Sequence, residues 1–159
     1  MDKRRLLEQL GTALRDELAL ANRVAKETAD AANHPEARPE NDKDTRKLEL
    51  SYLAAGQAAR AKELETGIAL LTQIPARDFG TEDAIAVGAF AELDVDGKVQ
   101  RVLVSPAGGG LKLTGEQGEI NVVTPASPLG RGLLGKCRGD AFELVIGRER
   151  REVTIVAVA

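Results

Sequence analysis

Four acidic residues stand close together around a proline-containing break between two helical segments, and their side chains are the ones best suited to chemistry. They are Glu36, Glu40, Asp42 and Asp44. Carboxylate oxygens are the ligands that a hard divalent cation such as Mg²⁺ prefers. Because helix positions i and i+2 point about 200° apart, Asp42 with Asp44, or Glu40 with Asp42, can hold one ion only if residues 40–44 are turn-like. A structural alternative is that they cap the second helix, where negative charge meets the positive end of the helix dipole.

Other kinds of site lack the residues they need. His34 is the only histidine and Cys137 is the only cysteine, so the chain cannot complete a zinc site, an internal disulfide or a Ser-His-Asp nucleophile set. The formal charge of −3 comes from 25 acids and 22 bases spread evenly over both halves, which excludes a polybasic nucleic-acid binder. The sequence shows no signal-peptide core and no membrane-spanning apolar run, so we expect a folded cytoplasmic protein.

The N-terminal half has the pattern of a two-helix coiled coil. Residues 3–32 contain no proline and are rich in strong helix formers, and a second helical segment continues to about residue 73. Apolar and small residues recur in both segments with the alternating spacing of a coiled-coil seam. The seam positions are Leu7, Leu14, Leu18, Ala21, Ala25, Thr28 and Ala32, then Leu50, Ala54, Gln57, Ala61, Leu64, Ile68 and Leu71. We therefore predict an antiparallel hairpin over residues 1–75, roughly 45 Å long, with its tip at about 34–44.

The period of the pattern changes after a linker predicted at residues 76–83. Alternating apolar residues and the turn-forming pair Asp96-Gly97 predict strands near residues 87–95, 99–104, 120–124, 141–146 and 152–158. A short helix is expected before the last two strands, because Ser127 suits the N-cap, Pro128 the first helical position and Gly135 a left-handed C-cap. Residues 84–159 are thus predicted to form an antiparallel sheet of four or five strands with one helix, which makes the fold α+β.

The run Ser-Pro-Leu-Gly-Arg-Gly-Leu-Leu-Gly-Lys at residues 127–136, set behind a helical hairpin, resembles the Gre transcript-cleavage factors GreA and GreB. These bacterial factors carry a similar run followed by a Gly/Asp turn, and their Tyr-x-Ala-Ala motif matches the sequence that starts at Tyr52. The resemblance spans nearly the whole chain and implies a coiled-coil hairpin followed by an FKBP-like domain. It also implies a transcription elongation factor that binds RNA polymerase, inserts its hairpin tip into the secondary channel and promotes cleavage of backtracked RNA.

In the Gre family two tip acids, in an Asp-x-x-Glu-Asn-x-x-Tyr pattern, help to hold the second Mg²⁺ of the polymerase active site. That ion is shared with the polymerase, so the resemblance implies no cofactor of the factor's own. The pattern is absent here, because alignment on Tyr52 places Thr45 and Leu48 at the two acidic positions. Three roles stay open for the four acids near the break. They position the metal from a shifted turn, they only cap the helix, or the hairpin modulates or inhibits the polymerase without stimulating cleavage.

The same resemblance places the helix at 127–134 at the rim of the polymerase channel, which makes Ser127, Pro128, Leu129 and Arg131 the partner-binding candidates. For Pro128 and Leu129, the helix cap and the core are equally good structural explanations. The resemblance implies a monomer that touches the transcript indirectly, makes no membrane contact and is not itself an enzyme. Two hypotheses compete with it. The hairpin dimerises or binds another target, or the domain is a prolyl isomerase, which three Phe, one Tyr and no Trp disfavour.

Overall fold

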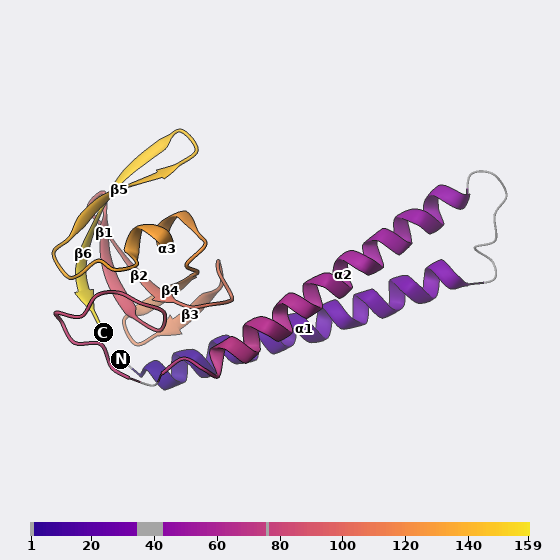
Figure 1. Ribbon diagram of the computed structural model, residues 1–159, viewed down its shortest axis with the longest axis horizontal. Helices are drawn as coiled ribbons and strands as arrows, with labels where there is room; N and C mark the ends of the chain where they lie inside the picture. Colours follow the sequence, from indigo (N-terminus) through magenta and orange to yellow (C-terminus); the bar gives the residue numbers. More distant parts are fainter. Residues whose placement is uncertain (1, 35–42, 76) are drawn as a thin grey trace. The chain divides into compact units, whose positions relative to one another are not determined.

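The computed structural model describes residues 2–34, 43–75 and 77–159, with the side chains of residues 43 and 44 left out. Within these ranges the chain forms two long helices followed by a six-stranded sheet and a short helix (Figure 1). The chain divides into two compact units. One is Thr12–Ile68, and the other combines Met1–Gly11 with Ala69–Ala159. The predicted α+β fold, with a helical hairpin followed by a sheet domain, is confirmed.

The hairpin unit contains most of α1 (Lys3–Asn33) and α2 (Lys43–Leu71), which run side by side in opposite directions (Figure 1). In α2 every predicted seam position is partly or fully buried, and between residues 45 and 71 only Gly67 joins them. In α1 the buried seam residues include Leu14, Ala21, Thr28 and Ala32. The predicted coiled-coil seam is therefore confirmed, and apolar burial along it holds the two helices together.

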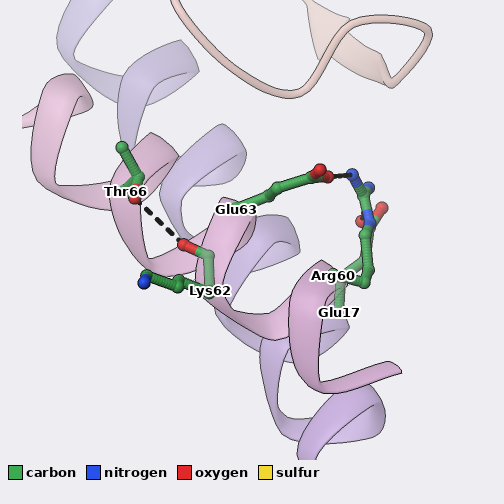
Figure 2. A network of polar contacts seen from close by, with 5 residues as sticks. All are labelled: Glu17, Arg60, Lys62, Glu63 and Thr66. Atoms are coloured by element: carbon green, nitrogen blue, oxygen red, sulfur yellow. Dashed lines mark hydrogen bonds and ion pairs between the residues drawn. The ribbon is translucent and has the colours of Figure 1, made fainter. Parts of the chain in front are cut away.

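Surface polar contacts mark the register of the hairpin without contributing much to its stability. Arg60 lies beside Glu17 of α1 and Glu63 of its own helix (Figure 2). The N···O distances of these two ion pairs are 3.0 and 3.6 Å. The Thr66 hydroxyl donates to the Lys62 carbonyl at 3.0 Å (Figure 2). Exposed ion pairs of this kind contribute only about 0–1 kcal/mol. The hairpin is therefore stabilised mainly by its seam.

The sheet unit is built from six strands in the order β3-β4-β2-β1-β6-β5. The strands are β1 Phe90–Val95, β2 Lys98–Val104, β3 Lys112–Gly115, β4 Gly118–Val123, β5 Ala141–Ile146 and β6 Glu149–Val158. Helix α3 (Pro128–Leu133) lies between β4 and β5 in the chain and packs against β5. The predicted turn between β1 and β2 is present, and Asp96 and Gly97 both have positive φ, as a tight hairpin turn requires.

The sheet differs from the sequence prediction in two respects. Strand β3 was not predicted, because it is only four residues long and Leu113 is its one buried side chain. Strand β4 runs parallel to β2, whereas the other neighbouring strands are antiparallel. The glycine run at 108–110 makes this possible: Gly108 and Gly110 have φ of 78° and 89°, so the backbone turns sharply there. The expected antiparallel sheet is thus a mostly antiparallel one with a single parallel pair.

The segment that follows α2 contributes to the core of the sheet unit. Phe79 is 7% exposed and belongs to the main apolar cluster. The Lys3 ammonium, 4.6 Å from the ring centroid, and the Arg77 guanidinium, at 4.5 Å, both lie over its ring. The Lys3 ammonium also donates to the Arg77 carbonyl at 2.7 Å, and burial lowers the pKa of Lys3 while the charge of Asp78 partly opposes that shift. The predicted linker at 76–83 therefore includes a core side chain.

One edge of the sheet is covered by a side chain from the first turns of α1. The Gln9 side-chain amide donates to the Thr114 carbonyl and accepts from the Thr114 N–H, both at 3.0 Å. These two bonds take the place of a neighbouring strand at β3, and such covering protects an edge strand from pairing with another chain.

Candidate functional site

The segment that resembles the Gre run is a short helix with both ends closed by the chain itself. The Ser127 hydroxyl accepts from the Gly130 N–H at 3.0 Å and donates to the Thr124 carbonyl at 2.8 Å. Pro128 occupies the first helical position. Gly135 has a φ of 78°, and its N–H donates to the Ile85 carbonyl at 2.8 Å. The predicted N-cap and left-handed C-cap are confirmed.

Two glycines inside α3 are required by close packing. A Cβ at Gly130 would lie 1.9 Å from the Thr124 carbonyl oxygen, and a Cβ at Gly132 would lie 2.2 Å from the Phe142 ring. The helix therefore touches the preceding loop and strand β5 without an intervening side chain. Sequence reasoning considered only the ends of this helix and missed both residues. The sequence did contain a signal for this close packing. Two glycines lie inside a six-residue helix, where each lowers helix stability unless packing requires it.

The four predicted partner-binding residues are close together in the chain, but their side chains differ in how much surface they expose to a partner. Pro128 and Arg131 are exposed, whereas Ser127 and Leu129 are half-buried. Leu129 packs against the core cluster, and the Ser127 hydroxyl is already used in two hydrogen bonds. The Arg131 guanidinium donates to the Ala126 carbonyl at 2.7 Å. The surface that α3 can offer a partner is thus the Pro128 ring and the remaining donors of Arg131, and its binding role stays a prediction.

Exposed neighbours extend this surface with the same mixture of apolar and cationic groups. Leu134 is 37% exposed immediately after α3. Arg138 is exposed in the following turn, and the Lys136 ammonium lies 5.7 Å from the centroid of the Phe142 ring. A surface of this composition suits a protein partner that offers apolar side chains together with carboxylates.

The predicted tip acids lie almost entirely outside the described residues. This holds for Glu36, Glu40 and Asp42, and for the side chain of Asp44. The backbone of Asp44 belongs to the first turn of α2, so the turn-like conformation considered for residues 40–44 does not extend to it. Within the described ranges, no group of three or more His, Cys, Asp or Glu residues could hold a metal ion. Metal positioning by the tip acids stays a prediction.

Thr45 and Leu48 occupy the two positions where the Gre pattern has acids. Both are exposed, and Leu48 exposes 55% of its surface. Neither side chain can ligate Mg²⁺ as a carboxylate does.

Of the helices in the described ranges, none is long and apolar enough to cross a membrane.

Comparison with known proteins found similar solved structures but no matching family model and no matching curated sequence. The chain is similar to the GreA factor homolog 1 (Gfh1) of Thermus thermophilus, with 23% identity over 99% of this chain and 94% of that one and a TM-score of 0.39. It is also similar to Thermus aquaticus Gfh1, with 21% identity, coverage of 95% and 92%, and a TM-score of 0.38. A third structure, titled transcription factor Gfh1, matches with 27% identity, coverage of 98% and 92%, and a TM-score of 0.41. The predicted resemblance to Gre factors is confirmed, because the similar solved structures are of Gfh1, which is titled a GreA factor homolog.

Proposed function

We propose that the protein is a Gre-like transcription factor that binds bacterial RNA polymerase with the α3 surface and inserts its hairpin tip into the secondary channel. The observation that carries this proposal is the compact unit Thr12–Ile68, a two-helix hairpin whose seam is filled by its own residues. The apolar residues of the seam are thus covered within the chain itself. Helices of 31 and 29 residues at 1.5 Å per residue extend roughly 40 Å from the hairpin base to Asn33 of α1 and Lys43 of α2. A probe of that length can carry carboxylates into a narrow channel.

The proposed chemistry is that of the polymerase, with the hairpin supplying negative charge. The second metal of a two-metal phosphoryl reaction is held more firmly when extra carboxylates approach it. Asp42 and Asp44 are the first choice for this role, which requires Asp42 to lie before the helical turn that contains Asp44, and Glu36 and Glu40 are the alternatives nearby. The protein then stimulates cleavage of backtracked RNA and catalyses nothing by itself.

A second candidate function is favoured by the two residues at the family's acidic positions. Thr45 and Leu48 are exposed near the start of α2, where a cleavage factor of the Gre pattern has carboxylates. A hairpin without metal-holding groups in the channel blocks access to the active site or slows the polymerase. The two functions share the partner and the mode of insertion, and they differ in the sign of the effect on transcript cleavage.

The test is a cleavage assay on backtracked complexes of the polymerase from the same organism. We expect the purified protein to bind the polymerase and to accelerate transcript shortening. The double variant Asp42→Ala, Asp44→Ala should lose at least tenfold of the stimulation while it keeps its affinity. A matched control, Glu63→Ala with Glu65→Ala, removes the same charge from exposed positions of α2 far along the helix from the tip.

Each outcome separates the candidates. Unchanged cleavage by the double variant excludes Asp42 and Asp44 from metal positioning. Binding of the wild-type protein with slower cleavage or slower elongation supports the second candidate. Absence of binding to the polymerase overturns both.

A further inference from the structure

The two helices of the hairpin differ in how many large apolar side chains they expose outside the seam. In the described residues of α1, Leu20 is the one large apolar side chain that is well exposed, at 50%. Helix α2 exposes Leu48 at 55%, Tyr52 at 70% and Leu53 at 49% within six residues. Its seam nevertheless is buried as predicted. Helix α2 therefore has apolar residues on the face that packs inward and on its outward side, and packing within the chain explains only the first.

Most of the outward residues form a continuous stripe. At 100° per residue, Leu48 and Tyr52 fall within a sector of about 100° that is centred roughly opposite the seam, whereas Leu53 lies about 60° outside this sector, toward the seam. Between residues 45 and 59 no charged residue falls in this sector. We define the outer stripe by Leu48, Tyr52, Ala55, Gly56 and Ala59, all of which are exposed.

Gly56, in the stripe, has no role in the packing of the hairpin. A Cβ built on it would meet nothing within 4 Å. Glycine in a helix interior is less favourable than alanine by about 1 kcal/mol. Gly67 in the same helix is buried, so packing can account for that one. Gly56 lowers the stability of α2 with no compensation inside the chain, and a glycine leaves room for another molecule to approach the helix backbone closely.

We propose that the outer stripe of α2 packs against an apolar wall of the polymerase channel that receives the hairpin, with one element of that wall in close contact at Gly56. This inference rests on the proposed function. It adds a third contact, alongside the α3 surface and the tip, and assigns it to apolar protein side chains.

The composition and size of the stripe favour this occupant over two others. Nucleic acid is recognised through cations that neutralise phosphates, and the stripe contains none. A second copy of the chain would need to bury roughly 800 Å² per partner, which two large and three small side chains cannot supply. A patch of this size is effective where other contacts already hold the same partner in place, because its binding is then intramolecular.

The experiment compares stripe variants with matched variants elsewhere on the hairpin. Gly56→Leu fills the place of close approach, and Leu48→Ser with Tyr52→Ser removes the apolar contacts. Leu20→Ser on α1 and Ala58→Leu outside the stripe make equivalent changes at exposed positions. We expect the stripe variants to weaken binding to the polymerase roughly tenfold and the two controls less than twofold. Circular dichroism melting verifies that each variant is folded.

Gly56→Ala provides a readout that a merely structural role cannot imitate. Alanine is the better helix former and has room, so the variant should melt at a higher temperature than the wild type. Its affinity for the polymerase should nevertheless fall, by roughly two- to fivefold, because the added methyl group holds the partner away. Higher thermal stability together with weaker binding is the expected combination.

Three results overturn the inference, and they are distinguishable. If the wild-type protein does not bind the polymerase, the proposed function fails and this inference fails with it. If the wild type binds and acts while the stripe variants match their controls, only the inference fails. If sedimentation shows a wild-type dimer that Gly56→Leu dissociates, the stripe is a self-association surface.

Discussion

Helices α3 and α2 both contain interior glycines, and the reasons differ. In α3 a methyl group at Gly130 or Gly132 would collide with a carbonyl oxygen or an aromatic ring. In α2 a methyl group at Gly56 would meet nothing. The glycines of α3 are accounted for by the fold, whereas the glycine of the outer stripe is not. A residue that costs stability and gains nothing inside the chain is the better guide to an external partner.

The same contrast applies to the side chains around these glycines. Ser127 looks like a binding residue in the sequence, yet its hydroxyl is already engaged twice in the cap of α3. Tyr52 belongs to a weaker motif, yet it exposes 70% of its surface. The stretch that carries the strongest family resemblance is thus largely structural, and the outer stripe of α2 is where apolar surface is left over.

The largest effect is expected at Gly130. Replacement by Ala places a Cβ 1.9 Å from the Thr124 oxygen, so backbone must move, and the free energy of unfolding of the sheet unit should fall by about 4 kcal/mol. Gly135→Ala is the control, since its cost comes only from the φ of 78° and should be about 1 kcal/mol. Urea denaturation measures both. A loss at Gly130 no greater than at Gly135 would remove the packing explanation and break the contrast with Gly56.

A second large effect is expected within one pair of neighbouring leucines. Leu133 is fully buried in the core cluster, whereas Leu134 is 37% exposed. Leu133→Ala should lower the free energy of unfolding by about 3 kcal/mol, and Leu134→Ala by less than about 0.5 kcal/mol. If instead Leu134→Ala selectively weakens polymerase binding, the exposed edge of α3 gains direct support as a contact surface.

A smaller effect is expected at the cap of α3. Ser127→Ala removes the acceptor for the Gly130 N–H and should lower the free energy of unfolding by about 1 kcal/mol. Ser127→Thr keeps the hydroxyl and should lose less than half of that. Polymerase affinity should be unchanged in both folded variants, because the hydroxyl is occupied within the chain. A loss of affinity in Ser127→Ala without loss of stability would contradict the structural role.

The smallest effect is expected at the ion pair between the two hairpin helices. Glu17→Gln leaves the packing intact and removes an exposed pair with Arg60, so stability should change by less than about 0.5 kcal/mol. Ala61→Ser in the buried seam is the comparison and should cost more. Thermal melting of both variants sharpens the conclusion that the seam, and not surface charge, stabilises the hairpin.

Some of these features were predictable and others were not, for identifiable reasons. The seam of α2 was predictable because its period of alternating three and four residues is local and is repeated many times. The caps of α3 were predictable because Ser127, Pro128 and Gly135 have strong positional preferences. Strand β3 was not, since four residues with one buried leucine are too few to show a repeating pattern. The tip acids were singled out by their residue type and by their place at the break between the two helices, and their side chains lie outside the described residues.

Local patterns in the sequence by themselves determined the two helices, their seam, most of the strands and the ends of α3, because each depends on residues only a few positions apart. Tertiary structure alone decided which strands pair in parallel, which glycines are in contact with other groups and which apolar residues are left exposed. Those properties depend on residues that are far apart in the chain and become neighbours only in the folded structure. Local sequence patterns carry no information about such neighbours. The opposite environments of Gly56 and Gly130 arise in this way, since nothing local distinguishes a glycine that must be there for the fold from one that the fold could replace.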